Sequence, residues 1–328
     1  MRPRPSSGCS TLQTVQTADQ LTAEFSLADL LTFDEPHPGL PRLLVKTPAC
    51  TAELYLQGAH LTAWQPSGEQ PVLFLSARSE FVPGKAIRGG IPVIFPWFAS
   101  PSNSPVPTPA GAGSHGFART WPWTLRFAAL AGENLHLSLT LDQTEGLRAL
   151  GFTGFQLAYE LILGRTLTAR LSVANASSGE DAQPLFFEEA LHAYLAVGDS
   201  EKVTVDGLLD TEYLDKTDNF ARNTQTDRHL RFHGETDRPY LNTIAPLTLH
   251  DPVLGRRLVL RKTNSATTVT WNPGAELAGK LPDLGADAWR GFVCLETANV
   301  AENAVTLQPG EARTMEMHLA LEQDAVVL

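Results

Sequence analysis

The chain has 328 residues, of which 43% are hydrophobic, so it can bury a sizeable core in one large domain or two smaller ones. Its formal net charge of −11 argues against a nucleic-acid backbone or an anionic membrane as the main partner, although a small anionic ligand needs only a local group of Arg and Lys. Three cysteines (Cys9, Cys50 and Cys294) form no evenly paired framework, and no apolar run approaches the ~18 residues of a membrane span, so we expect a soluble cytoplasmic protein.

The N-terminal stretch "MRPRPSSGCSTLQTVQ" lacks the apolar centre of a secretory signal. We expect residues 1–18 to be disordered and residues 19–328 to form one domain, because no clear boundary follows. Long amphipathic helical patterns are nearly absent: "LTAEFSLADLL" (21–31) is weakly helical, and "GADAWRG" (285–291) suits a single helical turn.

Alternation of apolar and polar side chains with a period of two dominates the rest of the chain. It is strict in "LHLSLTLDQ" (135–143), "TLTARLSVAN" (166–175) and "RTMEMHLAL" (313–321), as is typical of half-buried antiparallel strands. Further strands are predicted at 41–47, 51–57, 59–65, 71–76, 122–130, 156–163, 184–197, 255–262, 267–272 and 291–297. Many short strands separated by Gly, Pro, Asn and Asp predict an all-β protein, a large antiparallel β-sandwich.

Two segments are rich in Gly and Pro. "IRGGIPVIFPWF" (87–98) places Arg88 beside two glycines and then breaks an apolar run with two prolines. "ASPSNSPVPTPAGAGS" (99–114) predicts a loop, which is either a functional lid or a solvated connector.

Two segments carry histidines that suit either a structural or a chemical role. "AGSHGFARTWPW" (112–123) sets His115 and Arg119 around a glycine, in a loop or at a strand end. In "FFEEALHAYLAVGD", an extended chain would place Glu188, His192 and Tyr194 on one face. The adjacent Glu189 would point to the other face, so these two glutamates are not a paired catalytic dyad. Taken alone, each histidine is more often a structural group.

Two further segments hold acidic side chains. "GFVCLETANV" (291–300) embeds Glu296 among uncharged residues, where burial would raise its pKa toward the range of a useful acid or base; the alternative is an outward-pointing edge residue. "HGETDRPYLNT" (233–243) groups Asp237 and Arg238, and a solvated turn with local ion pairs is the expected reading. No HExxH, CxxC pair, P-loop, GxGxxG after a strand or GxSxG occurs, so we expect no metal and no cofactor.

Seven stretches follow one another in a distinctive order: "IRGGIPVIFPWF", "SHGFART", "LHAYLAVGD", "GLLDTEYLDK", "ETDRPYLNT", "WNPG" and "CLETANV". With this set the chain resembles the D-hexose-6-phosphate mutarotases (glucose-6-phosphate 1-epimerases), a branch of the aldose 1-epimerase superfamily, from about residue 40 to 320. The resemblance implies a twisted antiparallel β-sandwich of the galactose mutarotase type with a sugar groove on one face, in agreement with the strand pattern.

The resemblance also implies roles for single residues. The general acid falls on His192 of "LHAYL" and the general base on Glu296 of "CLETA". The residues implied to bind substrate, including its phosphate, are Arg88, Ser114, His115, Arg119 and Asp237. Ser114 stands where related proteins often carry glutamine, a departure that bears on sugar preference. Which arginine is the main phosphate ligand is left open.

The surroundings of Arg88 follow from the same resemblance. Gly89 and Gly90 are expected to let the backbone approach the ligand closely. An apolar floor for the sugar is expected from Phe95, Pro96 and Trp97.

The implied chemistry needs only two proton-transfer groups. Interconverting α and β anomers requires removal of a proton from the C1 hydroxyl, delivery of one to the ring oxygen, rotation about C1–C2 and reclosure. One carboxylate and one histidine on opposite sides of the sugar suffice, each contributing roughly 10²–10⁴-fold. We expect Glu296 to be ionised while His192 carries the proton.

Three readings follow. The first is an isomerase, a cofactor-free mutarotase of a hexose 6-phosphate with glucose 6-phosphate as the leading candidate; its partner is a small sugar phosphate, with no nucleic acid and no membrane, and a monomer is compatible with the sequence. The second is a mutarotase of unphosphorylated aldoses. The third is a catalytically silent sugar-phosphate-binding protein on the same fold.

Overall fold

The computed structural model describes residues 15–322. Within them the helices are short. They are α1 (Ala18–Phe25), α2 (Glu145–Ala149) and α3 (Gly274–Ala278), with the 3₁₀ turns η1 (Pro101–Asn103), η2 (Gly179–Asp181), η3 (Lys216–Asp218), η4 (Ala288–Gly291) and η5 (Ala301–Asn303).

Two eight-stranded antiparallel sheets form the body of the described structure. The first has the order β13-β17-β18-β22-β9-β8-β7-β6, and its strands are β6 (Thr124–Ala131), β7 (Asn134–Leu141), β8 (Phe155–Leu163), β9 (Thr166–Asn175), β13 (Thr204–Asp206), β17 (Leu247–Asp251), β18 (Arg256–Thr263) and β22 (Ala312–Glu322). The second has the order β15-β14-β16-β19-β20-β11-β5, with β12 also paired to β20, and its strands are β5 (Val93–Ile94), β11 (Glu189–Leu191), β12 (Tyr194–Ala196), β14 (Glu212–Asp215), β15 (Ala221–Thr224), β16 (Thr236–Tyr240), β19 (Thr267–Asn272) and β20 (Phe292–Asn299).

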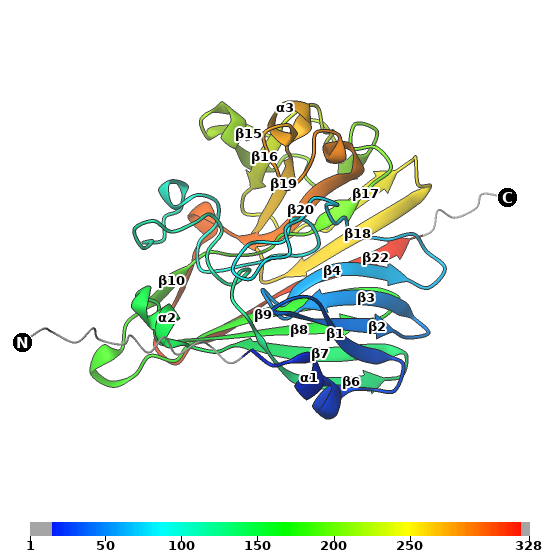
Figure 1. Ribbon diagram of the computed structural model, residues 1–328. Coiled ribbons are helices and arrows are strands. Elements are labelled where there is room, and N and C mark those ends of the chain that lie inside the picture. The colour runs from blue at the N-terminus through cyan, green and yellow to red at the C-terminus, as the bar shows by residue number, and fades with distance from the viewer. Residues whose placement is uncertain (1–14, 323–328) are drawn as a thin grey trace, which may run out of the picture.

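Two smaller sheets complete the fold. One is β1 (Leu31–His37), β2 (Leu40–Lys46), β3 (Cys50–Tyr55) and β4 (His60–Pro66), and the other pairs β10 (Leu185–Phe187) with β21 (Val305–Leu307). Figure 1 shows β6 to β9 crossing the lower half of the molecule, with β15, β16 and β19 in the upper half.

The strictly alternating segments form the strands of the first sheet, as predicted. In β7, β9 and β22 the apolar side chains are buried on one face, while their polar neighbours are partly exposed on the other. Each fully buried Leu or Val contributes about 1.5–3 kcal/mol relative to an exposed one, which fixes the register of these strands. The prediction of an all-β sandwich is confirmed.

The predicted strand at 184–197 is instead broken into β10, β11 and β12. Glu188 leaves the sheet because its carboxylate accepts hydrogen bonds from the backbone N–H groups of Phe98 (2.8 Å) and Ala301 (2.7 Å). His192 lies between β11 and β12, with its N–H bonded to the carbonyl of Pro92. The expected common face therefore holds for His192 and Tyr194 but not for Glu188.

Two other predictions differ from the structure. Residues 71–76 form only isolated bridges, at Leu73 and Leu75. The segment 233–243, expected as a solvated turn, contains β16, an interior strand between β14 and β19 whose Tyr240 is fully buried. The charged residues there obscured the strand: Asp237 lines a cavity, and Arg238 pairs with Asp215 of the neighbouring strand β14.

The segment 99–114 is a loop, as predicted, with η1 as its only regular element. Val106 is buried, and Ser104 Oγ donates to Glu188, so the loop is anchored to the body of the protein. Residues 15–17 are also placed, since Gln16 exchanges two hydrogen bonds with the backbone of Leu125 and Thr17 caps α1. This differs from the disorder expected for 1–18, of which residues 1–14 lie outside the described part.

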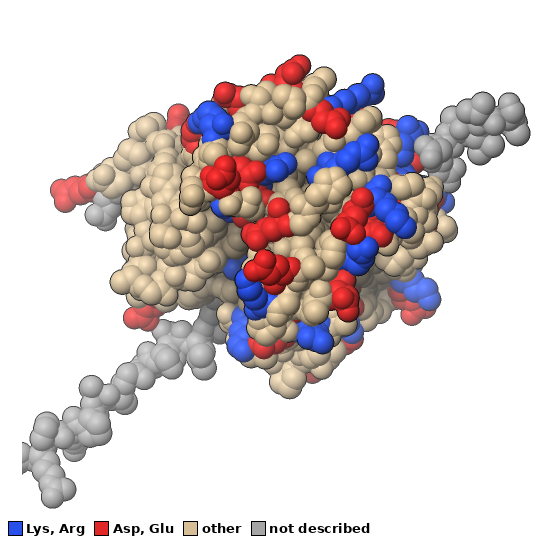
Figure 2. All heavy atoms as spheres, turned by 90° about the horizontal axis from the view of Figure 1, so that it is seen from above, with Lys and Arg blue, Asp and Glu red and all other residues tan. Residues whose placement is uncertain are grey.

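Charge on the surface is mixed. Figure 2 shows acidic and basic side chains interspersed over the face seen from above, so the net charge of −11 does not form one acidic patch there. No helix among residues 15–322 is long and apolar enough to cross a membrane.

Candidate active site

A cavity of about 120 Å³ lies over the second large sheet. Three neighbouring strands contribute to it: β16 with Asp237, β19 with Trp271 and β20 with Glu296. The full lining is Arg88, Phe98, His115, Arg119, His192, Tyr194, Lys216, Asp237, Trp271 and Glu296. Six of the seven predicted site residues therefore meet here, and Ser114 does not line the cavity.

His192 and Glu296 are direct neighbours. His192 Nε2 lies 3.3 Å from Glu296 Oε1, and the two side chains are 8% and 1% exposed. Neither Glu296 oxygen has a hydrogen-bond partner within residues 15–322, nor does His192 Nδ1. Buried polar atoms are nearly always paired, so these atoms are available to a polar ligand. We expected the two groups on opposite sides of a sugar; they lie side by side instead.

Burial determines where the proton of this pair resides. It raises the pKa of Glu296 well above its usual range, and Asp237 adds to the rise. Burial lowers the pKa of His192 well below its usual range, and Arg119 and Arg88 lower it further. Both shifts favour the uncharged forms in the free protein, with the proton of the pair on Glu296. We expected the reverse distribution, Glu296 ionised and His192 protonated, for the reacting site; the pair holds one proton in either case.

Aromatic rings fix the orientation of the His192 imidazole. The Tyr194 ring stacks on it at 4.8 Å and an interplanar angle of 9°, and the His115 and Trp271 rings present their edges at 5.6 and 6.1 Å. The Tyr194 hydroxyl accepts a hydrogen bond from Arg88 Nη1 at 3.1 Å. The stacked ring thus connects the imidazole to a cation of the same cavity.

Three cations line the cavity, and two of them are neutralised. Arg88 pairs with Asp283 at 3.0 Å, and Lys216 pairs with Asp237 at 2.6 Å. Arg119 has no carboxylate partner among the described residues, and its Nε is buried without a hydrogen-bond partner. Burial lowers the pKa of Arg119 to about 10, which still leaves it charged at neutral pH. The cavity therefore carries one unpaired positive charge, on Arg119.

The turn before Arg119 contains two of the predicted site residues, Ser114 and His115. Ser114 is exposed, and its carbonyl accepts a hydrogen bond from Arg119 Nη2 at 2.7 Å, so Ser114 contacts the arginine through its backbone. His115 Nδ1 accepts a hydrogen bond from the N–H of Ala99 at 3.3 Å. Burial, with Arg119, lowers the pKa of His115 well below its usual range, so the ring is neutral and carries its proton on Nε2.

The glycines beside Arg88 serve the packing of the protein. A Cβ on Gly89 would lie 2.4 Å from the carbonyl oxygen of Phe74, and one on Gly90 would lie 2.3 Å from that of Leu61. Both glycines have positive φ angles, +119° and +62°. Neither glycine is part of the cavity lining, and their expected role in ligand approach stays a prediction.

The apolar floor also differs from the prediction. Phe95 and Trp97 are buried in the main hydrophobic core, and Pro96 does not line the cavity. Phe98, the last residue of the same stretch, lines it together with Trp271.

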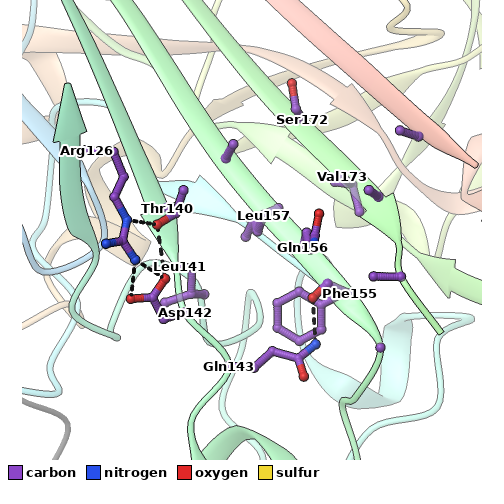
Figure 3. A pocket seen from close by; sticks show the side chains of 15 residues that line it. Arg126, Thr140, Leu141, Asp142, Gln143, Phe155, Gln156, Leu157, Ser172 and Val173 are labelled. Atoms are coloured by element: carbon purple, nitrogen blue, oxygen red, sulfur yellow. Dashed lines mark hydrogen bonds and ion pairs between the residues drawn. The ribbon is translucent and has the colours of Figure 1, made fainter. Parts of the chain in front are cut away.

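A roomier cavity of about 610 Å³ lies elsewhere, on strands β6 to β9 (Figure 3). Its described lining contains no histidine, and its single carboxylate, Asp142, is engaged by Arg126 and Thr140. It therefore lacks an available acid–base group. No cluster of three or more His, Cys, Asp or Glu side chains able to hold a metal ion occurs within residues 15–322.

Four lining residues were not selected from the sequence as site residues: Phe98, Tyr194, Lys216 and Trp271. Each lies in or next to a quoted motif, since Lys216 ends "GLLDTEYLDK" and Trp271 begins "WNPG". Asp283 stands in no such motif, and only the fold brings it to Arg88.

Comparison with known proteins places this geometry in a family. Residues 41–320 match the family model described as aldose 1-epimerase. An Escherichia coli protein provisionally named a glucose-6-phosphate 1-epimerase is 37% identical over 80% of this chain and 84% of its own. The crystal structure of a provisionally assigned mutarotase from Salmonella typhimurium has a TM-score of 0.82 and 30% identity, covering 92% of this chain and 96% of that one.

A more distant likeness supports the fold. A galactose mutarotase-like protein from Clostridium acetobutylicum has a TM-score of 0.65 at 13% identity, covering 90% of this chain and 98% of that one. The family model matches most of the chain, and relatives of 30% identity or more carry epimerase or mutarotase names. An acid–base pair in a buried cavity is consistent with that family. This chain belongs to the aldose 1-epimerase family.

Proposed function

We propose that this protein interconverts the α and β anomers of a hexose 6-phosphate, with glucose 6-phosphate as the leading candidate. The observation that carries the proposal is the unpaired charge of Arg119 in the same cavity as the His192–Glu296 pair. An acid–base pair alone would suit any aldose, whereas an unneutralised buried guanidinium favours an anionic substrate.

Arg119 is the principal phosphate ligand in this proposal. Its guanidinium has donors that no carboxylate occupies, and pairing with phosphate would offset the cost of its burial. Arg88 is already bonded to Asp283 and Tyr194, so it is assigned a secondary contact.

His192 and Glu296 carry out ring opening. Glu296 as carboxylate takes the proton of the C1 hydroxyl while His192 as imidazolium gives one to the ring oxygen, and reclosure reverses both transfers. Both oxygens are bonded to C1, so two groups 3.3 Å apart can serve them together. Starting from the free protein, the proton must first pass from Glu296 to His192.

Other lining residues orient the sugar. Asp237, held by Lys216, is placed to accept a hydrogen bond from a ring hydroxyl, and the Nε2–H of His115 is placed to donate one. Trp271 offers an apolar face to the ring carbons. Ser114 is assigned an indirect role through its carbonyl bond to Arg119.

The test is anomer exchange measured by NMR exchange spectroscopy on glucose, glucose 6-phosphate and galactose 6-phosphate side by side. We expect acceleration for a phosphosugar well above that for glucose. Arg119→Ala should weaken phosphosugar affinity roughly 10- to 100-fold and that of free glucose much less. Arg126→Ala, on β6 of the other large sheet and paired with Asp142, is the matched control and should change neither.

Other results would favour the other readings. Equal acceleration of free and phosphorylated sugars, with equal losses in Arg119→Ala, would indicate a mutarotase of unphosphorylated aldoses. Binding of a phosphosugar without acceleration would indicate a silent binding protein. We also propose a cytoplasmic location, since Cys50 and Cys294 are free thiols, as suits a reducing compartment.

A further inference from the structure

The cavity is electrically divided between its two proton-transfer groups. The charges that act on His192 are first Arg119 and Arg88, with a smaller contribution from Lys216, whereas those that act on Glu296 are Asp237 and Lys216. Lys216 and Asp237 neutralise each other at 2.6 Å. The net positive charge thus bears on His192.

The surroundings of the pair in the free protein oppose the protonation state that the proposed roles need. Burial and the arginines lower the pKa of His192 while burial raises that of Glu296, which favours the shared proton on Glu296. Asp283 cannot cancel this charge fully, because it already pairs with Arg88 while Arg119 has no carboxylate partner among the described residues.

We propose that the phosphate of the substrate activates its own turnover: by pairing with Arg119, it allows the shared proton to move from Glu296 to His192. The step is balanced, since the O–H bond of Glu296 breaks and an N–H bond forms on His192 across the 3.3 Å contact. The phosphate thereby acts on the acid–base pair besides holding the sugar. This inference rests on the proposed function and adds that phosphate binding regulates the acid–base pair.

The remaining groups around His192 do not supply this switch. His115 is neutral, because burial and Arg119 lower its pKa well below the usual range. Burial raises the pKa of Tyr194, so its hydroxyl stays protonated and its ring stacks on either form of the imidazole. Trp271 carries no charge.

The first test uses inorganic phosphate as the probe. The titration of His192 is followed by ¹⁵N NMR of histidine side chains in the full chain, with and without phosphate, at constant ionic strength set by chloride. We expect phosphate to move the midpoint upward by about one pH unit, a tenfold gain in protonated His192. Arg119→Ala should show the raised midpoint without phosphate and no further movement with it. An unmoved midpoint in the wild-type protein overturns the inference without any variant.

The second test measures activity with the sugar and the phosphate supplied as separate molecules. Exchange of glucose, which lacks the phosphate, should be accelerated roughly tenfold by added inorganic phosphate in the wild-type protein and in Arg126→Ala, but not in Arg119→Ala. If glucose 6-phosphate is exchanged rapidly while inorganic phosphate neither moves the His192 midpoint nor accelerates glucose, the inference fails and the proposed function stands. If no phosphosugar is exchanged, the proposed function itself fails.

Discussion

Replacing Glu296 by Gln should abolish most of the activity and at the same time stabilise the protein at neutral and higher pH. Gln keeps the size of the side chain but can neither take nor give the proton, so exchange of glucose 6-phosphate should fall by roughly 10²–10⁴-fold with little change in ligand affinity. The stability gain follows from burial: both carboxyl oxygens lack hydrogen-bond partners in the part of the chain that the structure describes, and the side chain is 1% exposed.

The sign of the pH dependence follows from the direction of the shift. Burial raises the pKa of Glu296 in the folded protein well above its value of 4.5 in the unfolded chain. Between these two pKa values the folded state binds more protons than the unfolded state. The stability that protonated Glu296 contributes is therefore fully present below pH 4.5 and is lost as the pH rises toward the pKa of the folded protein. The loss is about 1.4 kcal/mol per pH unit in that window, or on the order of 2–4 °C in Tm, and Glu296→Gln should escape it.

Thermal unfolding of both proteins from pH 4.5 to 8.5 measures this difference. Glu24→Gln, on the exposed side of α1, is the matched control and should track the wild type in both assays. A variant that keeps activity within tenfold of the wild type would remove Glu296 as the base. A stability difference that does not grow with pH would show that burial does not hold the proton on Glu296.

Three further substitutions probe the support of the site. Glu188→Gln should lower the free energy of unfolding in urea by about 1–3 kcal/mol. The carboxylate now accepts hydrogen bonds from two backbone N–H groups, and the amide NH₂ of Gln would face one of these donors; an unchanged urea midpoint would contradict this. Gly90→Ala should destabilise the protein strongly, since its Cβ would lie 2.3 Å from the carbonyl oxygen of Leu61 at a positive φ; a variant that melts like the wild type would refute the packing argument. Tyr194→Phe keeps the stacked ring but loses the bond from Arg88, so kcat/KM for glucose 6-phosphate should fall roughly tenfold with the melting temperature nearly unchanged.

The strands were predictable where one face is buried and the other is not. The alternation in β7, β9 and β22 specifies their conformation, because a shift by one residue would expose every apolar side chain. The same reasoning failed for β16, where Asp237 lines a cavity and Arg238 pairs with Asp215 of the neighbouring strand. It also failed at 184–197, where Glu188 bonds to the backbone of two distant segments.

The family resemblance carried by short sequence motifs also indicated six of the ten residues that line the cavity, although they lie far apart in the chain. It could not determine the charge state of the site, since that depends on which carboxylate reaches which cation. Only the tertiary structure pairs Asp283 with Arg88, and leaves Arg119 without a carboxylate partner among the described residues. Burial, likewise a property of the folded chain, then favours the shared proton on Glu296 over His192.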